Sequence, residues 1–152
     1  MPKNFTNADL HGWYGYHRSG TLLTANGALQ TLASVGFIYF DGGRQGAPGG
    51  AGVFQSAEIT TKLDTQPGPG NMGKTNGVNP PVDPAVDIDP PTINGFYQVK
   101  FDGTFKMWCT DPALGCDGTV VGWGVLVGND EYYAMSLQPG RAVTLTGKKM
   151  QR

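Results

Sequence analysis

The stretch Gly12-Trp13-Tyr14-Gly15-Tyr16-His17-Arg18-Ser19-Gly20 decides the fold class. It is rich in aromatic residues, and its side chains alternate with the period of two that is typical of a β-strand. We therefore expect a strand over residues 12–24. One face of this strand carries Tyr14, Tyr16 and Arg18, and the other carries Trp13, His17 and Ser19.

Similar short segments follow along the chain and are separated by turn residues. Asp41-Gly42-Gly43 ends the second segment, and Phe101-Asp102-Gly103-Thr104 carries the Asp-Gly signal of a hairpin. We expect residues 25–31 to form a loop or a short helical turn. About eight strands with hairpin-type links predict an all-β fold, either a closed antiparallel barrel or a sandwich. The expected strands cover residues 12–24, 35–40, 53–63, 95–100, 105–109, 118–127, 131–137 and 142–147.

Residues 64–92 differ in composition from the rest of the chain. They hold seven of the eleven prolines, including the pairs Pro80-Pro81 and Pro90-Pro91. Because proline cannot donate to a sheet ladder, we expect a proline-rich loop excursion of irregular or polyproline form. Neither flanking half is long enough to build its own core. Residues 1–152 are therefore expected to form one barrel domain with a long Pro/Gly-rich loop insertion.

The composition excludes several classes of protein. The chain has 152 residues, of which 24 are Gly and 11 are Pro, and only 15% are charged. A net charge of −1 gives no electrostatic footprint for nucleic acid or for an anionic membrane. The longest apolar run is far shorter than the ~20 residues of a membrane-spanning helix. We therefore expect neither nucleic acid nor a membrane as a partner.

Two cysteines, Cys109 and Cys116, flank the turn-forming sequence Thr-Asp-Pro-Ala-Leu-Gly. A disulfide closes such a loop easily if the flanking segments run antiparallel. Two free thiols or a metal site are the alternatives, and both histidines lie far away in sequence. The disulfide indicates an oxidising compartment, so we expect a secreted or periplasmic protein. Residues 1–4 lead straight into polar sequence without a signal peptide, which is consistent with export only if the signal has been removed.

The order of these motifs resembles the allene oxide cyclase-like barrel family of small bacterial proteins. Leu10–Gly20 fits the family's opening Leu-x-Gly-x-Tyr-x-Phe-x-x-Ser-Gly, with Tyr16 at the position of the phenylalanine. Phe40-Asp41-Gly42 and residues 95–103 fit two further motifs, and the closing strands with Val125-Leu126-Val127 and Gly147 are also similar. The resemblance implies an eight-stranded antiparallel barrel whose interior holds an apolar small molecule. Members that are enzymes are cofactor-free cyclases or isomerases, and many others are exported. No catalytic residue of plant allene oxide cyclase finds a matching motif.

The resemblance places one face of the first strand inside the barrel. Arg18 then points inward, near the strand's end, where an apolar residue is expected. Because a buried guanidinium must be paired or used, Arg18 and Glu58 are candidate catalytic residues, with a tyrosine hydroxyl as another partner for Arg18. The alternative is that Arg18 extends to solvent. The candidate ligand-binding residues are Tyr14, Tyr16, Tyr97, Phe105 and Met107.

Trp13, Phe37 and Tyr39 fall on the opposite, outer face. Such an apolar stripe needs a cover. It is a candidate subunit interface, and the alternatives are a bed for the proline-rich loop or a platform for stacking carbohydrate. The interface hypothesis predicts a homo-oligomer.

Two further groups of polar residues have simple explanations. His11 and His17 lie on the outer face and are interpreted as solvated. Asp83, Asp87 and Asp89 could supply oxygen ligands to Ca²⁺, but they lack the glycine and the final glutamate of an EF-hand. We interpret them as a solvated acidic loop and predict neither a metal site nor a cofactor.

Three functions are compatible with these observations. In the first, the chain is a barrel that binds an apolar small molecule and acts on it as a cofactor-free cyclase or isomerase. In the second, the chain is a non-catalytic ligand-binding barrel. In the third, it is a structural or assembly protein whose exterior aromatic residues make subunit contacts. An open interior favours the first two functions, and an interior filled with side chains favours the third.

Overall fold

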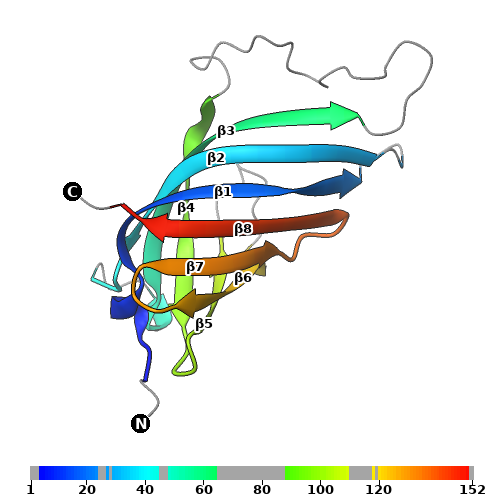
Figure 1. Cartoon of the computed structure of the whole chain (residues 1–152). Helices are drawn as coiled ribbons and strands as arrows, with labels where there is room; N and C mark the ends of the chain where they lie inside the picture. The colour runs from blue at the N-terminus through cyan, green and yellow to red at the C-terminus, as the bar shows by residue number, and fades with distance from the viewer. Residues whose placement is uncertain are drawn as a thin grey trace.

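Eight strands form one closed antiparallel barrel in the computed structural model (Figure 1). Each strand pairs with the next one along the chain, and β8 pairs with β1 to close the ring. This confirms the barrel and excludes the sandwich. The strands are β1 (His11–Leu23), β2 (Leu29–Asp41), β3 (Gly52–Asp64), β4 (Ile88–Val99), β5 (Thr104–Trp108), β6 (Val120–Val127), β7 (Glu131–Ser136) and β8 (Arg141–Lys149).

The structure describes residues 4–23, 27, 29–44, 48–64, 88–109, 118 and 120–150, and for residues 48, 57–64 and 88–94 it describes the backbone only. Two short 3₁₀ turns, η1 (Asn7–Asp9) and η2 (Pro48–Gly50), complete the described elements.

β2 begins earlier than the sequence predicts. Residues 29–31 belong to the strand, so the expected loop or helical turn over residues 25–31 is wrong for this part. Leu29 pairs with Leu23 and Thr31 pairs with Thr21 at the end of β1. Pairing with a neighbouring strand therefore overrides the weak local signal of these residues.

The predicted boundaries of the proline-rich excursion are wrong at both ends. Asp64 is the last residue of β3, and residues 88–92 belong to β4. Ser56 pairs with Ile93 and Glu58 with Asp89, so three residues of β4 oppose one residue of β3 in a bulge. The bulge contains Pro90 and Pro91, where the ladder needs no N–H donor. The rest of the excursion, residues 65–87, lies outside the described residues.

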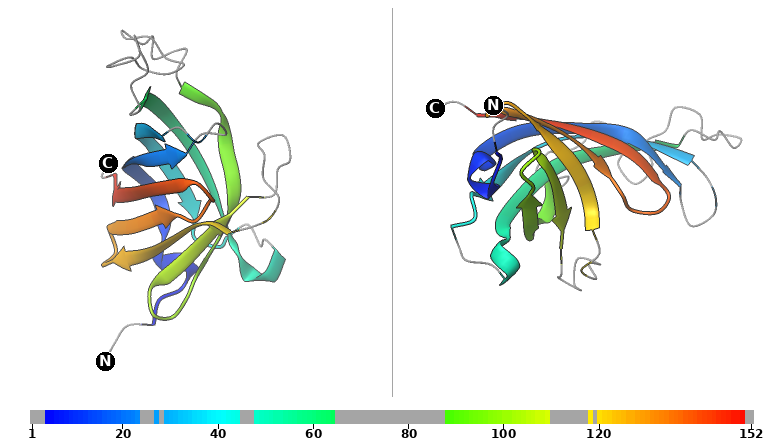
Figure 2. Two further views of the ribbon diagram at one scale, coloured as in Figure 1. Left: turned by 90° about the vertical axis from the view of Figure 1, so that its right-hand side faces the viewer. Right: turned by 90° about the horizontal axis from the view of Figure 1, so that it is seen from below.

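The strands differ strongly in length. β1, β2 and β3 have 13 residues each, whereas β5 has five and β7 has six. In Figure 1 the three long strands and β8 extend well beyond β7. Figure 2 shows from two other sides how the sheet curls back on itself to close. One end of the barrel is thus a complete ring, and at the other end the long strands project.

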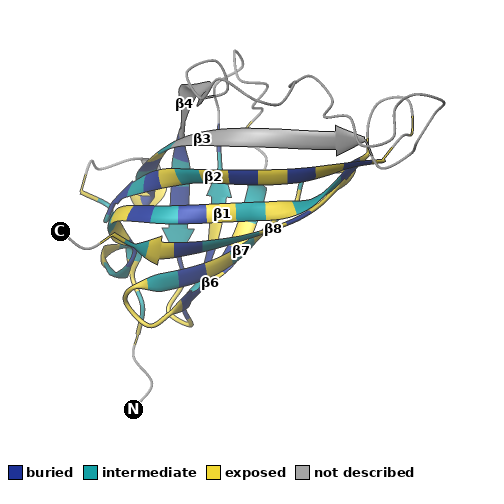
Figure 3. Cartoon of the chain, turned by 45° about the horizontal axis from the view of Figure 1, so that its top comes forward, coloured by how far each residue is buried: buried dark blue, intermediate teal, exposed yellow. Residues whose placement is uncertain are grey.

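The side chains of β1 and β2 alternate between the inside and the outside of the barrel. Figure 3 shows buried and exposed residues following one another along β1 and β2. The inward residues near the complete end form one apolar core, and burying each large side chain there stabilises the fold by about 1.5–3 kcal/mol. This core consists of Leu10, Tyr14, Tyr16, Ile38, Phe40, Phe54, Tyr97, Val99, Phe105, Leu126 and Tyr132.

Four aromatic rings of this core are packed in the same way. Each lies opposite a glycine on the neighbouring strand. A Cβ atom added at any of these glycines would collide with the ring opposite it. The absent side chains therefore provide the space in which the rings lie, so that a small barrel is filled by residues of large volume. The pairs are Gly52 with Tyr97, Gly95 with Phe54, Gly124 with Phe105, and Gly147 with Tyr132.

The turn η1 and the residues around it lie against this filled end. Leu10, directly after η1, is fully buried in the core. The Asn7 side chain accepts a hydrogen bond from the Val99 backbone N–H at 2.7 Å and donates one to the Gly50 carbonyl at 2.8 Å. The buried Asp41 carboxylate accepts from the backbone N–H of Val53 at 2.9 Å. The hydrogen bonds of Asn7 therefore hold the N-terminal segment against the strands, and that of Asp41 holds β2 against the start of β3.

Candidate functional site

A polar pair lies on the inner face of β1 and β2, between apolar residues. Arg18 on β1 stands directly across from Ser34 on β2, and its Nε donates a hydrogen bond to the Ser34 Oγ at 3.2 Å. Ser34 is only 3% exposed, and Arg18 is partly buried. We call these two residues the Arg18–Ser34 pair. It occupies the inner face at about the middle of the two long strands.

Apolar residues lie on both sides of the Arg18–Ser34 pair. Tyr14 and Tyr16 precede Arg18 on the inner face of β1 and belong to the aromatic core. Toward the projecting end, a second apolar cluster of Leu22, Leu32 and Val143 follows. The guanidinium is therefore flanked by apolar side chains in both directions along the strands.

A further polar side chain lies beside the second cluster. Gln30 is 8% exposed and pairs with Leu22 across β1 and β2. Buried amides and guanidinium groups are costly unless they form hydrogen bonds. The projecting half of the inner face is therefore more polar than the filled end.

The predicted pair of Arg18 and Glu58 is only partly described. Glu58 lies on β3 opposite Gly36 of β2, and Gly36 in turn pairs with Tyr16 of β1. Ser34 pairs with Thr60, so the backbone register places Glu58 two residues along β3 from the position opposite Ser34. The side chain of Glu58 lies outside the described residues, so its catalytic role with Arg18 stays a prediction.

The predicted ligand-binding aromatics are packed into the core. Tyr14, Tyr97 and Phe105 are buried almost completely, and Tyr16 is also buried, while Met107 packs against the core from a partly buried position. All five point inward, in agreement with their expected side of the barrel. Their rings and side chains nonetheless fill the interior at this end, and contact with a ligand stays a prediction.

The hydroxyl groups of two of these tyrosines form internal hydrogen bonds. The Tyr97 Oη donates to the Leu10 carbonyl at 2.7 Å and accepts from the Gly42 N–H at 2.8 Å. Burial raises the Tyr97 pKa well above its ordinary value, because the charged form would be desolvated. The Tyr14 Oη donates to the Asn129 carbonyl at 3.3 Å, and burial, aided by the nearby Asp130, raises the pKa of Tyr14 to about 12. Both hydroxyl groups are therefore uncharged at physiological pH, and their hydrogen bonds hold neighbouring segments together.

Tyr132 is a central residue that the sequence did not single out. Its ring makes edge contacts with the rings of Tyr14, Phe40 and Phe105, at centroid distances of 5.5, 5.8 and 5.7 Å. Its hydroxyl is buried and has no hydrogen-bond partner among the described residues. Burial raises its pKa strongly. The alternation of β7 permits either face for Tyr132, and only its pairing with Gly147 settles that it lies inside.

Trp13, Phe37 and Tyr39 lie on the outer surface, as the alternation predicts. The Trp13 ring lies 5.6 Å from the Phe37 ring and 5.2 Å from the Tyr39 ring. Trp13 and Phe37 are exposed, and Tyr39 is partly buried. We call these three residues the Trp13 cluster. Its predicted role as a subunit interface stays a prediction.

Cys109 is buried directly after β5. The described part of the chain contains no free cysteine. Cys116 lies outside the described residues, so its pairing with Cys109 stays a prediction. Asp83 and Asp87 also lie outside them, as does the side chain of Asp89. Within the described ranges, no group of three histidine, cysteine or carboxylate side chains is placed to hold a metal ion.

The fold and this interior define a small closed antiparallel barrel with a polar pair inside it. Comparison of the chain with protein-family models, curated proteins and solved structures finds no match. In the part of the chain that the structure describes, no helix has the length and apolar character required to cross a membrane.

Proposed function

We propose that the protein is a non-catalytic binding barrel for an apolar small molecule that carries a carboxylate or a similar anionic head group. The observation that carries this proposal is the Arg18–Ser34 pair, a guanidinium and a hydroxyl on the inner face between two apolar clusters. Apolar walls with a few placed polar groups are typical of small-molecule sites.

The chemistry of arginine supports an anionic head group. A guanidinium has five N–H donors in a planar fork, which matches the two oxygens of a carboxylate. The hydrogen bond to Ser34 uses Nε and thereby fixes the direction of the side chain. An Arg side chain inside an apolar barrel costs free energy, and such a cost is often found at binding sites.

The lengths of the strands support entry from the projecting end. The aromatic core fills the complete end, so the tail of a ligand has no room there. The inner face of β1 and β2 continues past the Arg18–Ser34 pair to Leu22 and Leu32. A ligand entering from this side would place its apolar tail against the second cluster and its head group at Arg18.

The test uses two probes of equal chain length, sodium dodecanoate and dodecan-1-ol, measured by isothermal titration calorimetry. We expect the carboxylate to bind about tenfold more tightly than the alcohol, because a charge-assisted bond is stronger than a neutral one. Arg18→Gln should remove this preference and leave the affinity for the alcohol unchanged. Arg44→Gln, in the exposed turn after β2, is the matched control and should leave both affinities unchanged.

Two results would overturn the proposal. One is the absence of saturable binding of either probe by the folded wild-type chain. The other is a preference for the carboxylate that survives Arg18→Gln while circular dichroism shows an intact fold.

A further inference from the structure

The outer surface of β6 and β7 is apolar over an extended area. Five side chains point outward there, and Trp123, Tyr133 and Met135 are 42%, 47% and 47% exposed. Exposed apolar patches of several hundred Å² mark interaction sites on soluble proteins. We call this surface the β6–β7 face; its apolar residues are Trp123, Val125, Val127, Tyr133 and Met135.

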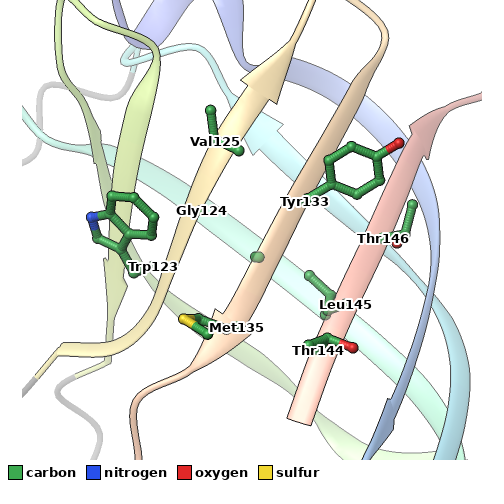
Figure 4. Close-up of a pocket in the computed structure, with 9 residues that line it drawn as sticks. Trp123, Gly124, Val125, Tyr133, Met135, Thr144, Leu145 and Thr146 are labelled. Carbon is green, nitrogen blue, oxygen red and sulfur yellow. The ribbon is translucent and has the colours of Figure 1, made fainter.

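The β6–β7 face is hollowed into a groove of ≈ 380 Å³ that continues onto β8 (Figure 4). Figure 4 shows Trp123 and Met135 on one side of the groove, with Tyr133 and Thr146 on the other. In the Trp13 cluster the rings already cover one another. No aromatic partner within the described residues covers Trp123 or Tyr133, and their exposed fractions are similar to the 39% of Trp13 and the 49% of Phe37.

Two opposite charges flank the apolar centre of this face. Val125 pairs with Thr104 of β5 on one side and with Tyr133 of β7 on the other. Lys106 lies two residues beyond Thr104, and Glu131 lies two residues before Tyr133, in opposite directions along the strands. Strand spacing and rise place these two charged residues roughly 16 Å apart, which is too far for an ion pair within one molecule.

Neither charge is neutralised by an ion pair within the described part of the chain. The Lys106 ammonium lies 5.3 Å from the centroid of the Trp108 ring. The nearby Glu131 carboxylate raises the Tyr133 pKa through hydrogen bonding and its charge. Glu131 also pairs with Lys148 of β8 across the ladder, so one side of the apolar centre carries Lys106 and the other carries Glu131 with Lys148 beside it.

We propose that a second copy of this chain covers the β6–β7 face. A twofold axis that lies in the interface and passes over Val125 brings Lys106 of one copy opposite Glu131 of its partner, and does so twice. Such a surface is complementary to itself in charge and in apolar character. The net charge of −1 leaves little long-range repulsion between two copies.

The size of the face sets the strength of the association. The exposed parts of its five apolar side chains amount to roughly 400 Å² per copy. A standard stable interface buries about 800 Å² per partner, so the dimer lies at the small end of the range even with its polar rim. We therefore expect a reversible dimer in the micromolar range of concentration.

The test is a charge swap measured by sedimentation velocity from low to high micromolar concentration. Lys106→Glu and Glu131→Lys should each raise the dimer Kd by roughly tenfold, because each places like charges opposite one another twice. The double variant exchanges both charges and should return the Kd to within about threefold of the wild-type value. Lys100→Glu, an exposed reversal outside the face, is the matched control and should leave the Kd unchanged.

A second pair of variants separates this face from the Trp13 cluster. Trp123→Ser should abolish the dimer, and Phe37→Ser should leave it intact. The proposal is overturned by a wild-type chain that is monomeric throughout the range, or by a double swap that stays as weak as the single variants. It is also overturned if Phe37→Ser dissociates the dimer and Trp123→Ser does not. None of these measurements involves a ligand, so they stand apart from the dodecanoate test.

Discussion

The filled end and the middle of the barrel are both built from antiparallel strand pairs, yet their inward positions hold opposite kinds of residue. At the filled end, rings such as Tyr132 lie against glycines. In the middle, Arg18 lies against Ser34, so a polar group faces a polar group. The strand pattern is the same in both places, and the residue across the ladder decides the outcome. A ring opposite a glycine becomes core, whereas a guanidinium opposite a hydroxyl becomes a candidate site.

The largest expected effect comes from removing the central ring. Tyr132→Ala should lower the free energy of unfolding by about 3–5 kcal/mol, because it leaves a cavity among three other rings. Urea denaturation followed by near-UV circular dichroism measures the loss. Arg18→Ala should cost less, because Arg18 is only partly buried and its removal leaves no cavity among packed rings. Equal losses in the two variants would contradict the distinction between the two regions.

Adding a single methyl group at a glycine should have the next largest effect. Gly147→Ala drives a Cβ into the Tyr132 ring and should cost about 1–3 kcal/mol by overpacking. Gly122→Ala on β6 is the matched control, because its nearest atom would lie at an ordinary 3.6 Å. The control should leave the thermal midpoint almost unchanged. If both variants melted alike, the rings would not depend on the glycines for their space.

The same chemical change at two tyrosines should have opposite signs. Tyr97→Phe removes a hydroxyl with two short hydrogen bonds and should cost about 1–3 kcal/mol. Tyr132→Phe removes a buried hydroxyl without a partner and should stabilise the fold by up to about 1 kcal/mol. Paired denaturation curves measure the difference. A loss at both positions would show that the Tyr132 hydroxyl has a partner.

Raising the pH into the alkaline range should destabilise the filled end through Tyr14. Changes of pH around neutrality should have no effect through this residue. The Tyr14 pKa is raised to about 12 in the folded chain, whereas an unfolded tyrosine has a pKa of about 10. The unfolded state therefore loses its proton first, so the contribution of Tyr14 to stability is constant below pH ~10 and falls between about pH 10 and 12. Tyr14→Phe should flatten this decline in urea midpoints. Identical pH profiles for the two proteins would exclude Tyr14 as a contributor.

Local pattern predicted the faces of β1 and β2 correctly. Tyr14 and Tyr16 lie inside, and Trp13 and Phe37 lie outside, because alternation is fixed by the pleat once one residue is placed. The hairpin at Asp102-Gly103 was also predictable, since Gly103 adopts a φ of +88° that a glycine takes without strain.

Features that depend on strand register were not predictable. Ser34 becomes the partner of Arg18 only through the pairing of β1 with β2. The bulge that admits Pro90 and Pro91 likewise depends on how β3 meets β4. In β6, hydrophobicity alone favours Trp123 and Val125 as buried residues. They lie outside because Gly124 must face the Phe105 ring.

The pairing of β8 with β1 has a consequence for the order of folding. This seam joins residues such as Tyr14 and Lys149, which are separated by almost the whole sequence. The other strand pairs join neighbours along the chain, so they can form while the seam is still open. Until it closes, β1 and β8 each present an unpaired edge that can recruit a strand from another molecule. Pairing of β8 with β1 therefore removes both unpaired edges, and with them the risk of aggregation through strand pairing.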